Sequence, residues 1–186
     1  SDIMSLDILQ VWGHVKRGRY VPAHQHLNVT YLLVADEGDA LTVREGAYKV
    51  AAVCDIVHGG ERRPTLSAEL VPVSVQQMLS DALRDRCRSE IVVGVSSILV
   101  ATAWERDPVE SLMRILGEVC TECERILGVT LTVGIGRPCQ KLEELCRSCG
   151  EARAALEYRA VVGIGKPIYI QDMERLDRPV PEGDSH

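Results

Sequence analysis

The stretch SEIVVGVSSILVATAWE, residues 89–105, predicts two strands folded back on each other. Its flanks, Glu90–Val93 and Leu99–Trp104, are rich in β-branched and apolar residues, which favour strands. The centre, GVSSI at 94–98, holds a Gly and two Ser, which are typical of turns. Taken as one helix, the apolar run has about half the length that a membrane span needs, and the Gly-Ser break interrupts it. We therefore expect a buried β-hairpin.

The length and composition indicate one globular domain. A chain of 186 residues suits a single domain, and a hydrophobic content of 46% is enough for a sizeable core. Aromatic residues make up only 4% of the chain and Phe is absent. We therefore expect a core of Val, Leu, Ile, Ala and Cys.

The charge argues against a nucleic-acid-binding surface on this chain. The net charge is −6 and the isoelectric point is near 5.4, whereas neutralising phosphates requires clustered Lys and Arg. No basic or Ser-rich leader opens the sequence, and no apolar run has the length of a membrane span. We expect a cytoplasmic protein without membrane contact.

Helices and strands alternate on both sides of the hairpin. In chain order, the expected elements are strand Asn28–Ala35, helix Leu41–His58, helix Ser74–Arg86, the hairpin, helix Pro108–Leu127, strand Val129–Ile135, helix Lys141–Val162 and edge strand Ile168–Ile170. The order predicts a mixed α/β (α+β) fold: a ferredoxin-like mixed sheet with a central β-hairpin and helices packed on it. We assign residues 1–27 to an N-terminal helix or linker, 28–173 to the domain and 174–186 to a disordered tail.

Two CxxC pairs are the most conspicuous candidate metal ligands. They are Cys120-Thr-Glu-Cys123 and Cys146-Arg-Ser-Cys149. Two such pairs would suit a four-cysteine zinc site, but both fall inside predicted helices, where Cys serves as a small core residue. We favour reduced core cysteines and no metal, with zinc as the alternative.

The segments Gly134-Ile-Gly136 and Gly163-Ile-Gly165 echo each other. Neither has the spacing of a phosphate-binding P-loop. We expect turn glycines in both.

The predicted domain resembles the GGDEF, or diguanylate cyclase, fold. The closest match is specific over Val129–Met173. There, Gly134-Ile-Gly136-Arg-Pro138, Leu142–Ser148 and Glu151–Arg159 resemble the degenerate GGDEF-like domain of YesN-type AraC-family response regulators, to which the PucR/CdaR domains are related. The resemblance implies a nucleotide-cyclase-like fold that lies between a receiver and a DNA-binding helix-turn-helix.

The resemblance places the cyclase signature on the hairpin turn. Gly94-Val95-Ser96-Ser97-Ile98 stands where Gly-Gly-Asp-Glu-Phe would be expected, so two neutral serines replace the acidic pair. Hydroxyls do not substitute for carboxylates around a dication. After the first expected strand, Asp36 matches one metal-binding carboxylate, but Gly38 stands where the second is expected. We therefore predict no catalytic residues, no cofactor and no cyclase activity, and a vestigial ligand cleft formed by Asp36, Gly94, Ser96 and Ser97.

The function implied by this resemblance is a sensory or coupling domain of a bacterial two-component transcriptional regulator. It would signal by binding an unknown small ligand or by rearranging a homodimer. Its partners would be receiver and helix-turn-helix domains that this chain lacks, and DNA would be bound only through the latter. The alternatives are an active nucleotide cyclase with an atypical site, and a zinc-stabilised structural domain.

Overall fold

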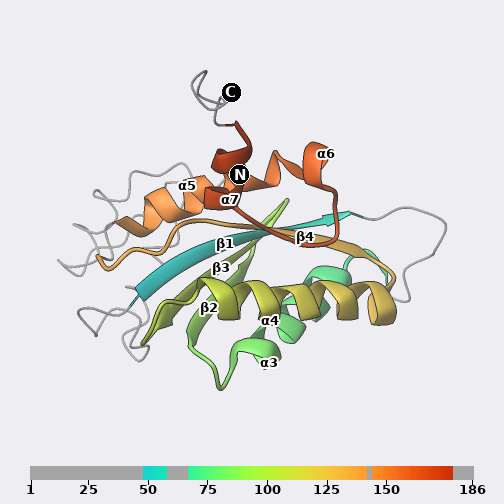
Figure 1. Cartoon of the computed structure of the whole chain (residues 1–186). Coiled ribbons are helices and arrows are strands. Elements are labelled where there is room, and N and C mark those ends of the chain that lie inside the picture. Colours follow the sequence, from blue (N-terminus) through green and yellow to red (C-terminus); the bar gives the residue numbers. More distant parts are fainter. Residues whose placement is uncertain (1–47, 58–66, 142–143, 178–186) are drawn as a thin grey trace, which may run out of the picture.

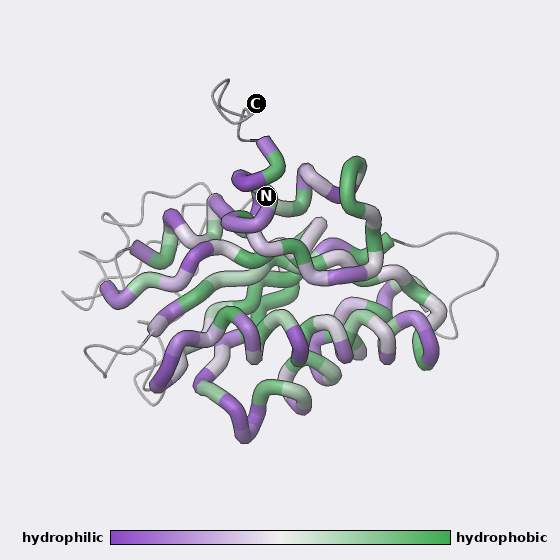
Figure 2. The backbone as a smooth tube through the Cα atoms, in the orientation of Figure 1, coloured by the Kyte–Doolittle hydropathy of each residue, from purple (hydrophilic) through white to green (hydrophobic). Residues whose placement is uncertain are grey.

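The structure is a computed structural model and describes residues 48–57, 67–141 and 144–177. A central sheet separates two layers of helices (Figure 1). The helices turn apolar residues toward the sheet and polar residues outward (Figure 2). Within the described ranges, no helix has the length and apolarity that crossing a bilayer would require.

The sheet has five strands in the order β2-β3-β1-β4-β5 in the described part of the chain. All neighbouring pairs are antiparallel except β4 and β5, which run parallel. The strands are β1 (Tyr48–Val57), β2 (Arg88–Val93), β3 (Ile98–Trp104), β4 (Thr130–Ile135) and β5 (Pro167–Tyr169). This mixed sheet confirms the predicted fold class.

Helices α3 and α4 cover one face of the sheet, whereas α5, α6 and α7 lie on the other side (Figure 1). The helices are α3 (Val71–Leu83), α4 (Val109–Glu122), its π-helical extension η2 (Cys123–Leu127), α5 (Leu145–Leu156), α6 (Arg159–Val162) and α7 (Ile170–Asp177). Two hydrophobic clusters form the core. The larger is centred under α3 and α4 and the smaller under α5.

The predicted hairpin is confirmed. Strands β2 and β3 pair from Arg88 opposite Ala103 to Val93 opposite Ile98, and every residue of β3 is buried. The helix predicted over 108–127 is also confirmed as α4 with η2. It ends at Gly128, whose φ of 69° is the left-handed conformation expected of a helix-terminating glycine.

The helix predicted over Leu41–His58 is wrong in its second half, because residues 48–57 form β1. The residues Val50, Ala52 and Cys54 face one cluster, while Ala51 and Val53 face the other. A strand in the centre of a sheet buries both faces, so its sequence is continuously apolar and lacks the alternation of a half-exposed strand. Such a continuous apolar run also fits the spacing of a helical stripe, which is why the sequence alone predicts a helix here. The expected elements before residue 48, including strand Asn28–Ala35, lie outside the described residues.

The C-terminal elements differ from the prediction in three places. The single helix expected over Lys141–Val162 is divided by a turn at Glu157 and Tyr158 into α5 and α6. Strand β5 ends at Tyr169, one residue before the expected Ile170. Residues 174–177 of the expected disordered tail are helical, because α7 extends to Asp177 and buries Ile170 and Met173.

The predicted turn glycines occur in only one of the two Gly-Ile-Gly segments. Gly163 and Gly165 have φ values of 102° and 75° and therefore do serve a turn. Gly134 lies inside β4 and Gly136 directly after it, where α5 packs on the strand. A Cβ added at Gly134 would lie 1.9 Å from the Ala152 carbonyl oxygen, and one at Gly136 would lie 1.9 Å from that of Ser148. These two glycines allow a helix to contact a strand backbone.

Candidate functional site

A cavity of about 220 Å³ opens at the tip of the β2–β3 hairpin. Three elements meet there: the end of β1, the first turn of α3 and the hairpin turn. Its lining consists of Ile56, Pro72 and residues 93–98. The hairpin turn, on which the sequence predicted the site, is therefore the main wall of a cleft.

A hydrogen bond fixes the shape of the hairpin turn. The Gly94 N–H donates to the Ser97 carbonyl oxygen at 2.8 Å, and a Cβ on Gly94 would lie 3.0 Å from that same oxygen. The turn presents Val95 to solvent, with 85% of its surface exposed. Ser96 is also exposed, and Ser97 is half-buried.

The side chains that line this cavity are neutral. They are aliphatic apart from the hydroxyls of Ser96 and Ser97, and none of the described lining residues is ionisable. Hydroxyls donate and accept hydrogen bonds, but they supply no charge to a dication. Within the described lining, the cleft therefore offers apolar contacts and hydroxyl hydrogen bonds to a ligand, but no charged side chain.

Asp55 is the carboxylate that β1 carries near the hairpin. It follows Cys54, which pairs with Ile98 across the sheet. Because neighbouring side chains of a strand point to opposite faces, Asp55 shares the α5 side with Val53, whereas Ile56 lines the cavity. The guanidinium of Arg159, at the start of α6, donates a hydrogen bond to the Asp55 carboxylate and forms an ion pair with it. This carboxylate is therefore already bound by a cation of the protein.

The structure brings together three of the four residues predicted to form the ligand cleft. Gly94, Ser96 and Ser97 all line the cavity, while Asp36 lies outside the described residues. The sequence prediction placed Asp36 after the expected strand Asn28–Ala35, which also lies outside the described residues. On the described strand beside the hairpin, β1, the carboxylate is that of Asp55. The signal was present in the sequence, since Asp55 directly follows the apolar run Val50–Cys54.

The two CxxC pairs lie on opposite faces of the sheet. Cys120 and Cys123 belong to the cluster under α3 and α4, whereas Cys149 belongs to the cluster under α5 and Cys146 is half-buried on α5. The sheet stands between the pairs, so this fold does not bring the four sulfurs to one ion. Burial raises the pKa of the Cys120 thiol to about 12 and that of Cys123 to about 11, and thus opposes the thiolate that zinc requires.

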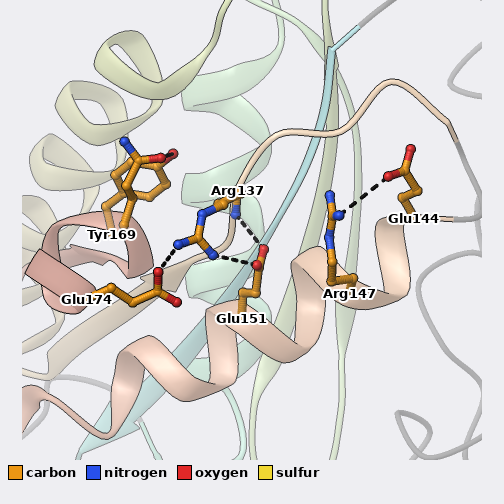
Figure 3. Close-up of polar contacts among 7 residues, drawn as sticks. Arg137, Glu144, Arg147, Glu151, Tyr169 and Glu174 are labelled. Atoms are coloured by element: carbon orange, nitrogen blue, oxygen red, sulfur yellow. Dashed lines mark hydrogen bonds and ion pairs between the residues drawn. The ribbon is translucent and has the colours of Figure 1, made fainter. Parts of the chain in front are cut away.

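A polar network at the end of β4 ties two helices together (Figure 3). Glu151 of α5 accepts hydrogen bonds from the Arg137 backbone N–H at 3.0 Å and from its Nη1 at 2.7 Å. Arg137 Nη2 also donates to Glu174 of α7. Arg137 and Glu151 both lie in the segments that carry the family resemblance. Their contact joins α5 to the end of β4, so packing explains the presence of these two residues.

The fold defines the class as a mixed α/β domain, with a cleft at the tip of its central hairpin. The sequence model of the GGDEF-like domain matches residues 30–158, and the chain belongs to this family. None of the curated proteins matches the sequence significantly.

Several solved structures resemble the chain, including the following two. An EAL/GGDEF domain protein from M. capsulatus superposes with a TM-score of 0.51 at 13% identity, over 68% of this chain and 87% of that one. The active GGEEF domain of a diguanylate cyclase from Vibrio cholerae gives a TM-score of 0.49 at 11% identity, over 70% of this chain and 86% of that one. At this identity, the first likeness supports the fold alone.

Proposed function

We propose that this GGDEF-like domain is a non-catalytic sensory or coupling module. The observation that carries the proposal is the neutral hairpin tip, where Ser96 and Ser97 occupy the positions that the resemblance assigns to two acids. Transfer of a phosphoryl group requires cations held by carboxylates, and the tip supplies none. The ion pair between Asp55 and Arg159 supports the proposal, since the nearby carboxylate of β1 already has a cationic partner.

A cyclase assay tests the absence of catalysis. The protein is incubated with GTP and either Mg²⁺ or Mn²⁺, and cyclic dinucleotide is measured by mass spectrometry. We expect none above background. The double variant Ser96→Ala/Ser97→Ala, purified in the same way, shows whether any signal depends on the two hydroxyls. Turnover that depends on the two serines would overturn the proposal and favour an atypical cyclase.

We propose further that the hairpin cleft is the sensory site. Its volume of about 220 Å³ accommodates a small molecule or one part of a larger one. Thermal unfolding is followed with nucleotides, cyclic dinucleotides and sugar acids as candidate ligands. A ligand that binds only the native state at about 100 times its Kd stabilises it by about 2.7 kcal/mol, which is easily measured.

Matched variants locate any ligand that is found. Ser97→Leu fills the cavity, and Gln77→Leu makes a comparable change at an exposed position of α3 outside it. We expect the thermal shift to disappear only in Ser97→Leu. A shift that survives Ser97→Leu would place the ligand elsewhere, and the absence of any shift would favour rearrangement of a homodimer as the signal.

The proposed setting is a bacterial two-component transcriptional regulator of the AraC family, as in YesN-type proteins. In such a protein, a receiver would precede the domain and a helix-turn-helix would follow it, so DNA would be bound outside this chain. The complete gene product tests this setting directly. A reading frame that encodes neither a receiver nor a helix-turn-helix would refute it. Light scattering of the purified chain tests the proposed homodimer.

A further inference from the structure

Helix α7 is attached to the domain by few of its residues. Of its eight residues, only Ile170 and Met173 are buried, and Leu176 is 59% exposed. An isolated helix of this length is unstable in water, so α7 depends on its contacts with the domain. Those contacts include the two buried side chains and two polar links to distant residues, from Arg137 to Glu174 and from Tyr158 to Asp177. A third, longer contact joins the Tyr169 hydroxyl to Gln171 at 3.5 Å.

The Arg137 guanidinium is held more firmly by α5 than by α7 (Figure 3). Glu151 receives two hydrogen bonds from Arg137, and its side chain is 17% exposed. Glu174 receives one, and its side chain is 52% exposed. Water and salt weaken an exposed ion pair much more than a sheltered one. The contact with Glu174 is therefore the one that opens first, while Arg137 remains on Glu151.

The hinge for such an opening lies beside the same arginine. Tyr169, the last residue of β5, is held by parallel pairing with Ile135 of β4. Helix α7 begins at the next residue, Ile170, without an intervening loop, and Arg137 follows Ile135 by two positions. Glu174 stands about one helical turn into α7. The link from Arg137 to Glu174 thus fastens the first turn of α7 at the point where the helix leaves the sheet.

The second polar link lies at the far end of α7. The hydroxyl of Tyr158, in the turn between α5 and α6, donates to the carboxylate of Asp177, the last residue of α7. Both partners are at the surface, so this link is also weak. The polar links are therefore made by Glu174, in the middle of α7, and Asp177, at its end, while Ile170 and Met173 are its buried residues.

We propose that α7 is a releasable strap with Arg137 as its latch. In the docked state, Arg137 bridges Glu151 and Glu174. In the released state, Arg137 stays with Glu151, α7 unwinds from Ile170 onward, and the rest of the domain keeps its structure. Release moves Asp177, the last described residue, away from Tyr158 without unfolding the sheet. This device does not depend on the function proposed above.

Amide hydrogen exchange measured by NMR on the whole chain tests the strap. The amides of residues 174–177 donate hydrogen bonds inside α7, so their exchange rates measure the opening of that helix. The exchange rates of the Val133 and Ala152 amides measure the opening of β4 and α5. We expect the α7 amides to exchange faster than the β4 and α5 amides in the unaltered protein. The variant Glu174→Gln should accelerate the α7 amides a further two- to fivefold, roughly the effect of one exposed ion pair, and leave Val133 and Ala152 unchanged.

Glu157→Gln is the matched control, because it makes the same charge change at an exposed residue outside α7. It should not alter exchange in α7. Two results would overturn the proposal. Equal exchange rates for α7, Val133 and Ala152 would mean that α7 opens only when the domain unfolds. Unchanged α7 exchange in Glu174→Gln would mean that the contact with Arg137 is not the latch.

Discussion

The two Gly-Ile-Gly segments are identical in sequence and opposite in their structural role. At 134–136, both glycines leave room for α5, whose carbonyl oxygens would lie 1.9 Å from an added Cβ. At 163–165, the surroundings leave space, since the closest atoms to an added Cβ are side-chain atoms at 3.4 Å or more. There the positive φ requires glycine. Glycine is thus required at 134 and 136 because a neighbouring helix leaves no room for a side chain. At 163 and 165 it is required because the backbone adopts a positive φ.

The comparison predicts that substitution is most costly at 134 and 136. Gly134→Ala and Gly136→Ala should each destabilise the domain by more than about 3 kcal/mol, because a Cβ would collide with the backbone of α5 and force the helix away from the sheet. Urea unfolding followed by circular dichroism measures the loss, and failure to fold is its extreme form. A loss below about 1 kcal/mol in both variants would show that α5 moves freely on β4.

Gly163→Ala should have the next largest effect. The residue adopts φ 102° and ψ 168°, a region that is almost restricted to glycine, and the strain is about 2 kcal/mol. The denaturation midpoint should fall while the dependence on urea concentration stays constant. A neutral substitution here would contradict the backbone explanation for this segment.

Gly165→Ala should cost about 1 kcal/mol, since a φ of 75° is close to the left-handed helical region. Asn tolerates that region better than Ala, so Gly165→Asn should recover part of the loss. At Gly134, by contrast, Asn should be at least as harmful as Ala, because the obstacle there is the α5 backbone. Recovery by Asn at Gly134 would remove the distinction between the two segments.

Gly150→Ala should have the smallest effect and the opposite sign. Gly150 lies in α5, is exposed, and has no atom within 4 Å of an added Cβ. Ala favours a helix interior over Gly by about 0.5–1 kcal/mol, so the midpoint should rise. A lower denaturation midpoint would show that α5 tolerates no added atom even on its outer side. The loss of stability in Gly134→Ala would then be weak evidence for close packing between α5 and β4.

The sequence predicted correctly those elements whose ends carry a local signal, such as a turn residue or a helix-terminating glycine. The Gly and Ser residues at 94–97 located the hairpin, and Gly128 located the end of η2. The Val109 N–H donates a hydrogen bond to the Asp107 carboxylate, in agreement with the expected start of α4. Each of these signals acts within a few residues, so it does not depend on the rest of the fold.

Elements that depend on distant contacts were the ones predicted wrongly. The strand character of Tyr48–Val57 comes from β3 and β4 on either side, which a local pattern does not include. The helical state of residues 174–177 depends on Arg137 and Tyr158, which are distant in sequence. The position of Ser96 and Ser97 was predicted because the hairpin carries its own turn signal.

The buried cysteines provide a chemical probe of local opening in this domain. Five of the seven thiols are buried, namely Cys54, Cys120, Cys123, Cys139 and Cys149. Their burial raises the pKa of Cys139 to about 11 and holds that of Cys54 well above its ordinary value, so these sulfurs stay protonated and shielded from electrophiles. An alkylating reagent added in brief pulses therefore labels each one only when the element around it opens. Because Cys54 lies on β1 and Cys149 on α5, the mass of the labelled peptides records whether strand and helix open together.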